Sequence, residues 1–465
     1  MASSFGGINT ALTSLYAQRR ALDVTGQNIA NANTEGYTRQ RADMQSQVGS
    51  ISAAVYSKTD GLGTGVAISD VHRLRDEYQE NQGRVEHGKS AYLTQATSAY
   101  NAIEDSFAEP GDTALAAQLH DMWGGWNDVS NNPQLAATRS TLLQQASTVA
   151  DGLNTAHAAL ASQWSQNNTT LSAYANEVNT AADSIAQLNG SIVKAKASGV
   201  TVNELEDRRD LQVMRLSELT GATASPRANG AIDVFVGNST LVSEFNTRKM
   251  EVSGADRLED QGSDPTTLRW SDTKSTVQAG GTMGAVADTM STIIPAISDA
   301  LDSVAKNLAD KVNTLHSSGF SKDGSTGLDF FTSSTGGDIT AGTIRLGITD
   351  PDQVAVSAQA GTLDNTIADQ MTDLGEAANG PDREYQAMIG QLGVASQATI
   401  RRGEIQATVT DQADAAREAY SGVNLDEEMT NLLTYQRGYE AASRVLTTID
   451  SMLDQLINRT GLVGR

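Results

Sequence analysis

The chain is 465 residues long, which is ample for more than one hydrophobic core. Its formal net charge is -23, and its basic residues are dispersed along the chain, so a nucleic acid is not an expected partner. The absence of cysteine excludes disulfides, thiolate metal sites and thiol catalysis. Aromatic residues are only 5% of the chain, which favours thin helices over one large globular core.

The first residues lack the features of a cleaved secretory signal. The first charged residue is Arg19, and residues 8–17 are interrupted by polar side chains. No run of 18 apolar residues occurs, so we expect no membrane insertion. These features predict either a cytoplasmic protein or one exported through a channel without cleavage of a signal peptide.

The N-terminal segment has the spacing of an amphipathic helix. Apolar residues seven apart, with one companion, predict a helix of roughly 25 residues with a single apolar stripe: Ile8, Leu12, Leu15, Leu22 and Ile29.

The C-terminal segment repeats this spacing. Its heptad row is Leu425, Leu432, Tyr439, Leu446 and Leu453. A second row at the companion heptad positions is Tyr435, Ala442, Ile449 and Leu456. Neither terminal helix can bury its stripe alone, so we expect the two to pack on each other. Periodicity leaves open whether this is only an intramolecular coiled coil or also a contact with other subunits.

The interior alternates between long helices and a β-rich segment. Heptad spacing predicts helices over about 135–197 and 294–315, and a further helical region is expected over about 384–420, which together favour an antiparallel bundle. Residues 221–281 contain short β-branched segments separated by turn formers, which predict a small antiparallel β domain. Two further strands are expected in 331–359.

The predicted fold is therefore mainly α with a small inserted β domain, in an elongated multidomain chain. We expect a terminal coiled-coil domain from 1–41 and 421–465, and a long-helix bundle from 42–220, 282–330 and 360–420. Residues 221–281 with 331–359 are expected to form the small outer β domain.

Motifs for catalysis or for cofactor and metal binding are not evident in the sequence. The five histidines have no zinc-binding helical spacing, and neither a phosphate-binding glycine loop nor a nucleophile elbow occurs. We therefore assign no catalytic, cofactor-binding or metal residue, and no cofactor. The charged residues Asp207, Arg208, Arg209 and Asp210 are expected to pair along one helix.

The segment QNIANANTEGYTRQ contains more amides than a helix end requires. Asn28, Asn31 and Asn33, followed by Gly36 and Tyr37, are typical of a helix C-terminus. Three asparagines within six residues also suggest amide side chains that bind backbone groups at a crowded junction.

These residues carry a resemblance to a known family. Residues 21–40 resemble the N-terminal signature shared by flagellar rod, hook and hook-associated proteins, and residues 422–458 resemble the matching C-terminal signature. The interior blocks 205–221, 279–290 and 308–331 are similar to those of the first hook-associated proteins, FlgK.

The resemblance implies a structural subunit of the hook–filament junction, outside the cell and not an enzyme. The implied partners are other copies of the chain in a ring, the hook protein, the next hook-associated junction protein and a cytoplasmic export chaperone on the C-terminal helix. The expected assembly interface consists of the five residues of the N-terminal stripe and the five residues of the row that begins at Leu425. The alternatives are a hook-type or filament-type axial protein, or a surface-exposed adhesin or antigen.

Overall fold

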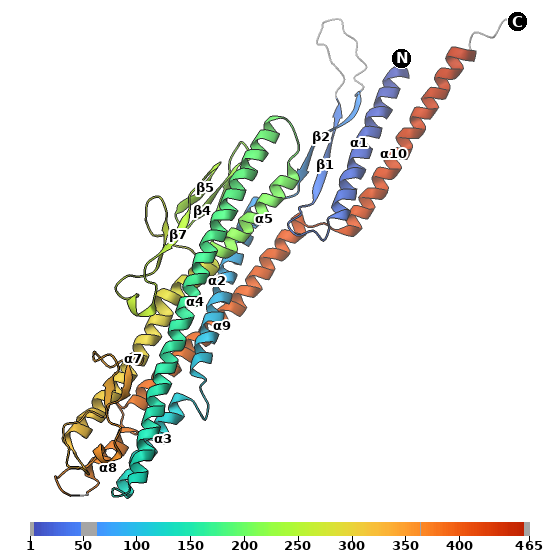
Figure 1. Cartoon of the computed structure of the whole chain (residues 1–465). Coiled ribbons are helices and arrows are strands. Elements are labelled where there is room, and N and C mark those ends of the chain that lie inside the picture. The colour runs from blue at the N-terminus through green and yellow to red at the C-terminus, as the bar shows by residue number, and fades with distance from the viewer. Residues whose placement is uncertain (1–3, 48–62, 363, 460–465) are drawn as a thin grey trace, which may run out of the picture.

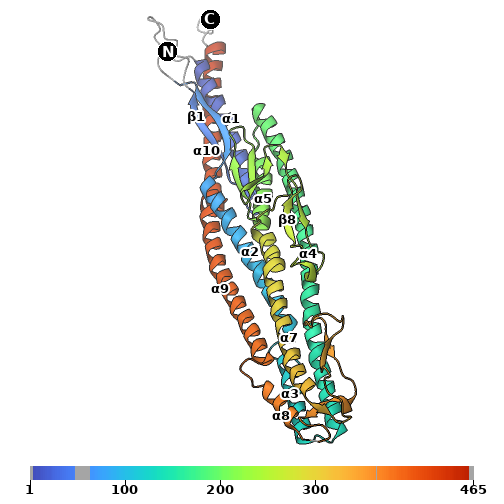
Figure 2. The same ribbon diagram turned by 90° about the vertical axis from the view of Figure 1, so that its left-hand side faces the viewer.

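Long helices run lengthwise through the molecule and make it a narrow rod (Figure 1, Figure 2). The computed structural model describes residues 4–47, 63–362 and 364–459, so the predicted domain ranges are described only within these limits. The helices are α1 (Ser4–Ala30), α2 (Glu77–Phe107), α3 (Leu115–Asn131), α4 (Ala136–Ala197), α5 (Asn203–Thr220), α6 (Gly281–Asp288), α7 (Ile294–Ser318), α8 (Thr366–Leu374), α9 (Pro381–Ser421) and α10 (Leu425–Asp454). The prediction of an elongated, mainly helical fold is confirmed. Among these residues, no helix combines the length and apolar character needed to cross a lipid bilayer.

Helix α4, with 62 residues, is the central element of the bundle. Helices α3, α5 and α7 pack against it, and α2 packs against α9. Its buried residues follow the predicted spacing, beginning with Leu142 and Val149 and continuing to Ile185. Trp164 is also fully buried, and its indole N–H donates a hydrogen bond to the Met290 carbonyl at 3.0 Å.

A four-stranded antiparallel sheet lies beside α4, within the segment where the sequence predicted strands. Its order is β3 (Thr223–Pro226), β4 (Ile232–Val236), β5 (Ser239–Ser243) and β6 (Asn246–Thr247). A separate hairpin follows, formed by β7 (Met250–Ser253) and β8 (Thr267–Trp270).

Two asparagines of α4 attach these strands to the helix. Asn189 donates to the carbonyls of Ile232 and Glu244, at 2.9 and 2.7 Å, and accepts from the Ile232 N–H. Asn179 both donates to and accepts from the backbone of Met250. Each amide binds backbone N–H and C=O groups of the strands that would otherwise be unpaired. These hydrogen bonds fix the positions of the sheets along α4.

The strands of 331–359 do not join this sheet, contrary to our expectation. β10 (Phe331–Ser333) pairs with β11 (Ile344–Leu346), and β12 (Ala355–Ser357) pairs with β9 (Phe320–Ser321). These ladders lie with α3 and α8 at the opposite end of the rod from the termini (Figure 1). Phe330 stacks on Trp126 of α3 with ring centroids 5.3 Å apart, so burial of aromatic surface holds the segment there.

A β-hairpin near the N-terminus was missed by the sequence analysis, which placed it in the helical bundle. It consists of β1 (Gln40–Gln47) and β2 (Gly65–Arg73), antiparallel, and it lies along α1 (Figure 1). The sequence of β1, QRADMQSQ, has no alternation of apolar and polar residues. Contact with α1 therefore stabilises the hairpin in place of intrinsic strand preference.

One histidine links three helices of the bundle. His87 of α2 lies 2.9 Å from an Asp414 carboxylate oxygen of α9 and 3.6 Å from a Glu218 oxygen of α5. The hydrogen bond to Glu218 and the pairing with Asp414 raise the pKa of His87, although burial opposes the shift. The protonated imidazole therefore favours the folded bundle.

We predict that the His87 contribution to stability is complete below about pH 6.5, the unfolded pKa, and is lost as pH rises through the higher folded pKa. The urea midpoints of the wild type and His87→Gln, compared from pH 5.5 to 8.5, should differ most at the acidic end. The exposed His120, replaced by Gln, is the control. A difference independent of pH would contradict the assignment.

Candidate assembly interface

The two terminal helices pack antiparallel in a fixed register. A Cβ placed on Gly7 would lie 3.0 Å from the side chain of Ile449, and a Cβ on Gly438 would lie 2.9 Å from Gln18. At the far end of the pair, Asn28 hydrogen-bonds Glu428 at 3.0 Å. In all three contacts the two residue numbers add to 456, which is the signature of one uninterrupted antiparallel register. We call α1 and α10 together the terminal pair.

The centre of the α1 seam is one residue away from the predicted stripe. Its contacts with α10 follow Gly7, Gln18 and Asn28, and the same 3–4 spacing includes the buried Ala11 and Ala21. The predicted residues lie along the edge of the seam, where each is only half-buried: Ile8, Leu12, Leu15, Leu22 and Ile29. Small residues allow the two helix backbones to approach closely, which moves the larger side chains outward.

In α10 the predicted companion row lies at the seam, since Ala442 is buried and Ile449 meets Gly7, and the other predicted row is displaced from it. Ala442 and Glu428 are the buried residues of α10. From the predicted row, Leu432, Leu446 and Leu453 are half-buried. Leu425 and Tyr439 are 49% and 41% exposed, so α1 covers them only in part, and their place in the assembly interface stays a prediction.

Further large apolar side chains of α10 are also exposed. These are Met429, Leu433, Val445 and Met452, each 50–57% exposed. Apolar surface of this extent along one helix is typical of a surface that binds another protein.

Asn28 is the best-satisfied polar side chain of the terminal pair. It is 1% exposed. Its amide nitrogen donates to the Gln40 carbonyl at 2.9 Å and to Glu428 Oε2 at 3.0 Å. Its oxygen accepts from the Gln40 N–H at 3.0 Å and from the Tyr37 hydroxyl at 2.9 Å. All four hydrogen-bonding positions of the amide are therefore used.

Glu428 is a buried carboxylate at the start of α10, and it is 2% exposed. Besides Asn28, it accepts a hydrogen bond from Arg39, whose Nε lies 2.8 Å from Oε1. Arg39 also pairs with Glu427 at 2.7 Å. Burial alone would lower the pKa of Arg39, but these two carboxylates raise it, so the ion pair stays charged. Burial, together with Asp207 and Glu428, also raises the pKa of Tyr37.

The other residues of the asparagine motif shape the chain after α1. Asn31 donates to the Gln27 carbonyl at 3.0 Å and accepts from Thr34, which closes the helix end locally. Gly36 has φ +76°, a conformation that glycine adopts without strain. Asn33 is exposed, and no side-chain hydrogen bond of it occurs in the described part of the chain. Of the three predicted asparagines, the structure brings only Asn28 into the interior.

Residues 37–40 form a connector between the terminal pair and the bundle. On the bundle side, the Thr38 N–H donates to Asp207 at 3.2 Å, and Asn203 donates to Gln40 Oε1 at 3.0 Å. Both Asp207 and Asn203 belong to α5. The Arg39 N–H also donates to the Ser421 carbonyl at the end of α9, at 3.0 Å. The connector is therefore held by α5 and α9, and also by α10 through the contact of Arg39 with Glu428.

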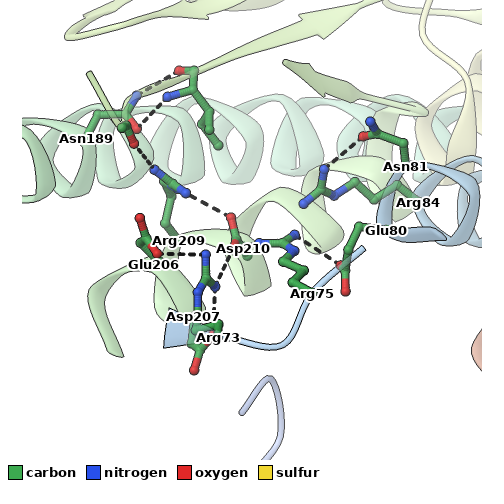
Figure 3. Close-up of polar contacts among 12 residues, drawn as sticks. Arg73, Arg75, Glu80, Asn81, Arg84, Asn189, Glu206, Asp207, Arg209 and Asp210 are labelled. Carbon is green, nitrogen blue, oxygen red and sulfur yellow. Dashed lines mark hydrogen bonds and ion pairs between the residues drawn. The ribbon is translucent and has the colours of Figure 1, made fainter. Parts of the chain in front are cut away.

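Arg73, at the end of β2, adds a salt-bridge cluster to the same attachment of the terminal pair to the bundle, which we call the joint (Figure 3). Its guanidinium lies 2.9 Å from Glu206, 2.8 Å from Asp207 and 2.9 Å from Asp210. The carboxylates of α5 thus pair across to the hairpin. This corrects our expectation that Asp207 and Asp210 pair mainly along their own helix.

Sequence reasoning did not single out Glu428, Arg39 or Arg73 as site residues. For Glu428 a signal was present, since a carboxylate at a position seven residues before Tyr435 falls in the companion row of a heptad pattern. Such a charge is expected to be buried and paired. Arg39 and Arg73 have no comparable local signal because their partners lie far along the chain.

Comparison with known proteins agrees with this architecture. The family "Flagella basal body rod protein" matches residues 8–38, and "Flagellar basal body rod FlgEFG protein C-terminal" matches residues 418–459. Between them, "Flagellar hook-associated protein FlgK helical domain" matches residues 100–331. The two terminal matches cover the terminal pair and the third covers much of the bundle.

Whole-chain relatives give the same result. Flagellar hook-associated protein 1 of Bacillus subtilis is 28% identical over 100% of both chains. The protein of that name from Escherichia coli is 24% identical over 97% of this chain and 99% of its own. The solved structure of the flagellar hook junction protein FlgK from Burkholderia pseudomallei, at 15% identity, covers 74% of this chain and 100% of its own, with a TM-score of 0.61, and supports the fold.

A terminal antiparallel helix pair that brackets a long-helix domain defines the class of axial proteins of the bacterial flagellum, which includes the rod and hook proteins. Within that class, the chain belongs to the FlgK family of hook-associated proteins. It is a structural component of the flagellum.

We predict that Asn28→Ala destabilises the terminal pair by ~3 kcal/mol, because it leaves the buried Glu428 carboxylate and the backbone of Gln40 with fewer partners. Hydrogen exchange measured by mass spectrometry should then be faster in residues 4–30 and 425–454, with little change in α4. Asn33→Ala, in the same motif but exposed, is the matched control. Equal exchange in the two variants would refute the anchoring role of Asn28.

Proposed function

We propose that this protein assembles on the end of the hook through its terminal pair and forms the hook–filament junction. It is a structural subunit that carries the next hook-associated junction protein and then the filament. The observation that carries the proposal is the row of only partly buried apolar side chains on both sides of the seam between α1 and α10. The relatives named hook-associated protein 1 support the place of the protein in the flagellum.

The geometry of the terminal pair explains how assembly is driven. A two-helix unit with a small-residue seam leaves the rows of Ile8 and Leu425 only partly covered. Neighbouring terminal pairs in a ring would bury these rows. At ~25 cal/mol per Å², several hundred Å² of apolar area per subunit contributes on the order of 10 kcal/mol before ordering costs.

The joint sets the orientation of the bundle relative to the terminal pair in this assembly. The terminal pair is bonded to α5 and α9 through the connector and through Arg73. A packed ring of terminal pairs would therefore hold each bundle at a set angle outside it. The bundle and its β-sheets then form the outer part of the junction. The helical-domain match at residues 100–331 favours this hook-associated role over a hook-type or filament-type subunit.

The role is mechanical, and we infer that the protein is not an enzyme. In the buried cluster around Asn28, the polar groups bind one another and leave no free group directed at a substrate. The proposed binding partners follow from the exposed apolar surface of the terminal pair. They are copies of the chain beside it, the hook protein below and the next junction protein above.

A further partner is expected before assembly. The exposed apolar residues of α10 would promote aggregation in the cytoplasm, so we infer that an export chaperone covers this helix until the chain leaves the cell. The assembled protein then lies outside the cell.

The assembly proposal is tested best at a residue that is exposed in the single chain. We predict that Leu433→Asp leaves α1 paired with α10 but prevents junction formation, because a carboxylate would be buried between subunits. Motility, and filament attachment seen by electron microscopy, measure the outcome. Phe245→Asp, which removes an exposed aromatic from the outer sheet, should remain motile.

Circular dichroism of the purified Leu433→Asp protein should show wild-type helicity, which separates loss of assembly from loss of folding. A motile Leu433→Asp strain with normal filaments would overturn the proposal that this face of α10 is an interface.

We also predict that a chain ending after Tyr420 no longer binds the export chaperone, since it lacks α10. Co-purification of the two proteins from the cytoplasm measures this, with the full chain as the positive control. Undiminished binding by the shortened chain would place the chaperone site elsewhere.

A further inference from the structure

A charged cleft lies beside the joint, outside the surfaces assigned to assembly. It has a volume of about 250 Å³ and is formed by the end of β2, the start of α2, one side of α5 and the edge of the sheet at β3 and β4. This is much larger than the ~30 Å³ that one water molecule occupies. The lining is rich in arginine, in a protein whose overall charge is strongly negative (Figure 3).

Most of the charges in the cleft are already paired. Arg75 bonds Asp210 and lies 3.1 Å from Glu80. Arg209 lies 3.3 Å from Asp210, which thus serves Arg73, Arg75 and Arg209 together. Arg73 also pairs with Glu206 and Asp207, and Arg75 with Glu80, so the charges of these three arginines are compensated.

Arg84 of α2 is the exception to this pairing. It lines the cleft and is only 5% exposed. Its Nη1 donates to Asn81 Oδ1 at 3.0 Å, while its Nε is buried without a hydrogen-bond partner. Within the described residues it forms no ion pair. The carboxylate of Glu77 also lines the cleft, but Glu77 is exposed.

The surroundings of Arg84 act against its charge. Burial, and then the neighbouring positive charge of Arg75, lower the pKa of Arg84 to about 10, although Glu80 and Glu77 oppose the shift. Arg209 is affected in the same direction, chiefly by burial. A buried guanidinium that makes no direct ion pair is costly, and a bound anion would provide one.

We propose that this cleft binds a small free oxyanion of the size of phosphate or sulfate, with Arg84 as the principal ligand and Arg75 beside it. A guanidinium presents two parallel N–H donors that match two oxygens of such an anion. The bound anion supplies the counter-charge that Arg84 lacks. The proposal concerns the single chain and does not depend on its place in the flagellum.

The position of the cleft gives anion binding a consequence for the joint. Arg73 and Asp210 line the cleft, and they also attach β2 to α5. An anion that binds Arg84 and Arg75 gives Arg75 a further partner, so Asp210 can pair more fully with Arg73 and Arg209. Occupancy of the cleft therefore strengthens the attachment of the terminal pair to the bundle.

Calorimetric titration of the purified full chain with inorganic phosphate, at constant ionic strength set with chloride, tests the proposal. The wild type should bind one phosphate saturably. Arg84→Met should bind at least ~10-fold more weakly, because it loses a charge-assisted pair of hydrogen bonds. Arg215→Met is the matched control, since it removes one positive charge from α5 at an exposed pair with Glu177 outside the cleft.

Thermal unfolding provides a second, independent measurement. In chloride alone, Arg84→Met should unfold at the same temperature as the wild type or higher, because it removes an unpaired buried charge. Added phosphate should raise the Tm of the wild type and of Arg215→Met more than that of Arg84→Met.

Three results would overturn the proposal. They are no saturable binding to the wild type, equal binding to Arg84→Met, or a lower Tm of Arg84→Met in chloride, which would make Arg84 a structural residue without need of a ligand.

Discussion

The buried contact between Asn28 and Glu428 is the interaction on which the rest of the structure depends. It joins the end of α1 to the start of α10, although the two residues lie 400 positions apart in the chain. A carboxylate that is 2% exposed is tolerated only with complete pairing, and here Asn28 and Arg39 supply that pairing. Because Asn28 also binds both backbone groups of Gln40, the same contact determines where the chain leaves the helix pair.

In the terminal pair, different residues set the register of the two helices and supply the apolar surface, whereas in most coiled coils the same residues do both. Small and polar residues such as Gly7, Ala442 and Asn28 occupy the seam and set its register. The larger apolar side chains lie at the edges, where they remain half-covered. A pair built with leucine at its centre would bury its apolar surface internally and leave little for neighbours. The observed arrangement holds the two helices together mainly by close approach and hydrogen bonds, and keeps hydrophobic area available for assembly.

In the bundle, too, polar side chains attach neighbouring elements to one another. Asn179 and Asn189 of α4 bind strand backbones, so the β-sheets are attached through a few directional hydrogen bonds as well as through apolar contact. Arg73 similarly connects the hairpin to α5. Directional contacts of this kind fix the positions of the sheets and of the hairpin along the elongated bundle.

The sequence by itself determined the helical segments of α1, α4, α7, α9 and α10, because helical apolar spacing is local, but it singled out no helix at α2 or α3. It also determined that Asn28 lies at a crowded junction and that residues 221–281 form strands. It placed the companion row of α10 at the seam, where Ala442 is buried and Ile449 meets Gly7, but its α1 stripe lies one residue away, because such stripes differ only by a modest rotation of the helix. Only the tertiary structure decided the β1–β2 hairpin, whose polar strand β1 depends on α1, and the pairing of Arg39 and Arg73. Partners hundreds of residues apart leave no local pattern, so their contacts exist only once the chain has folded.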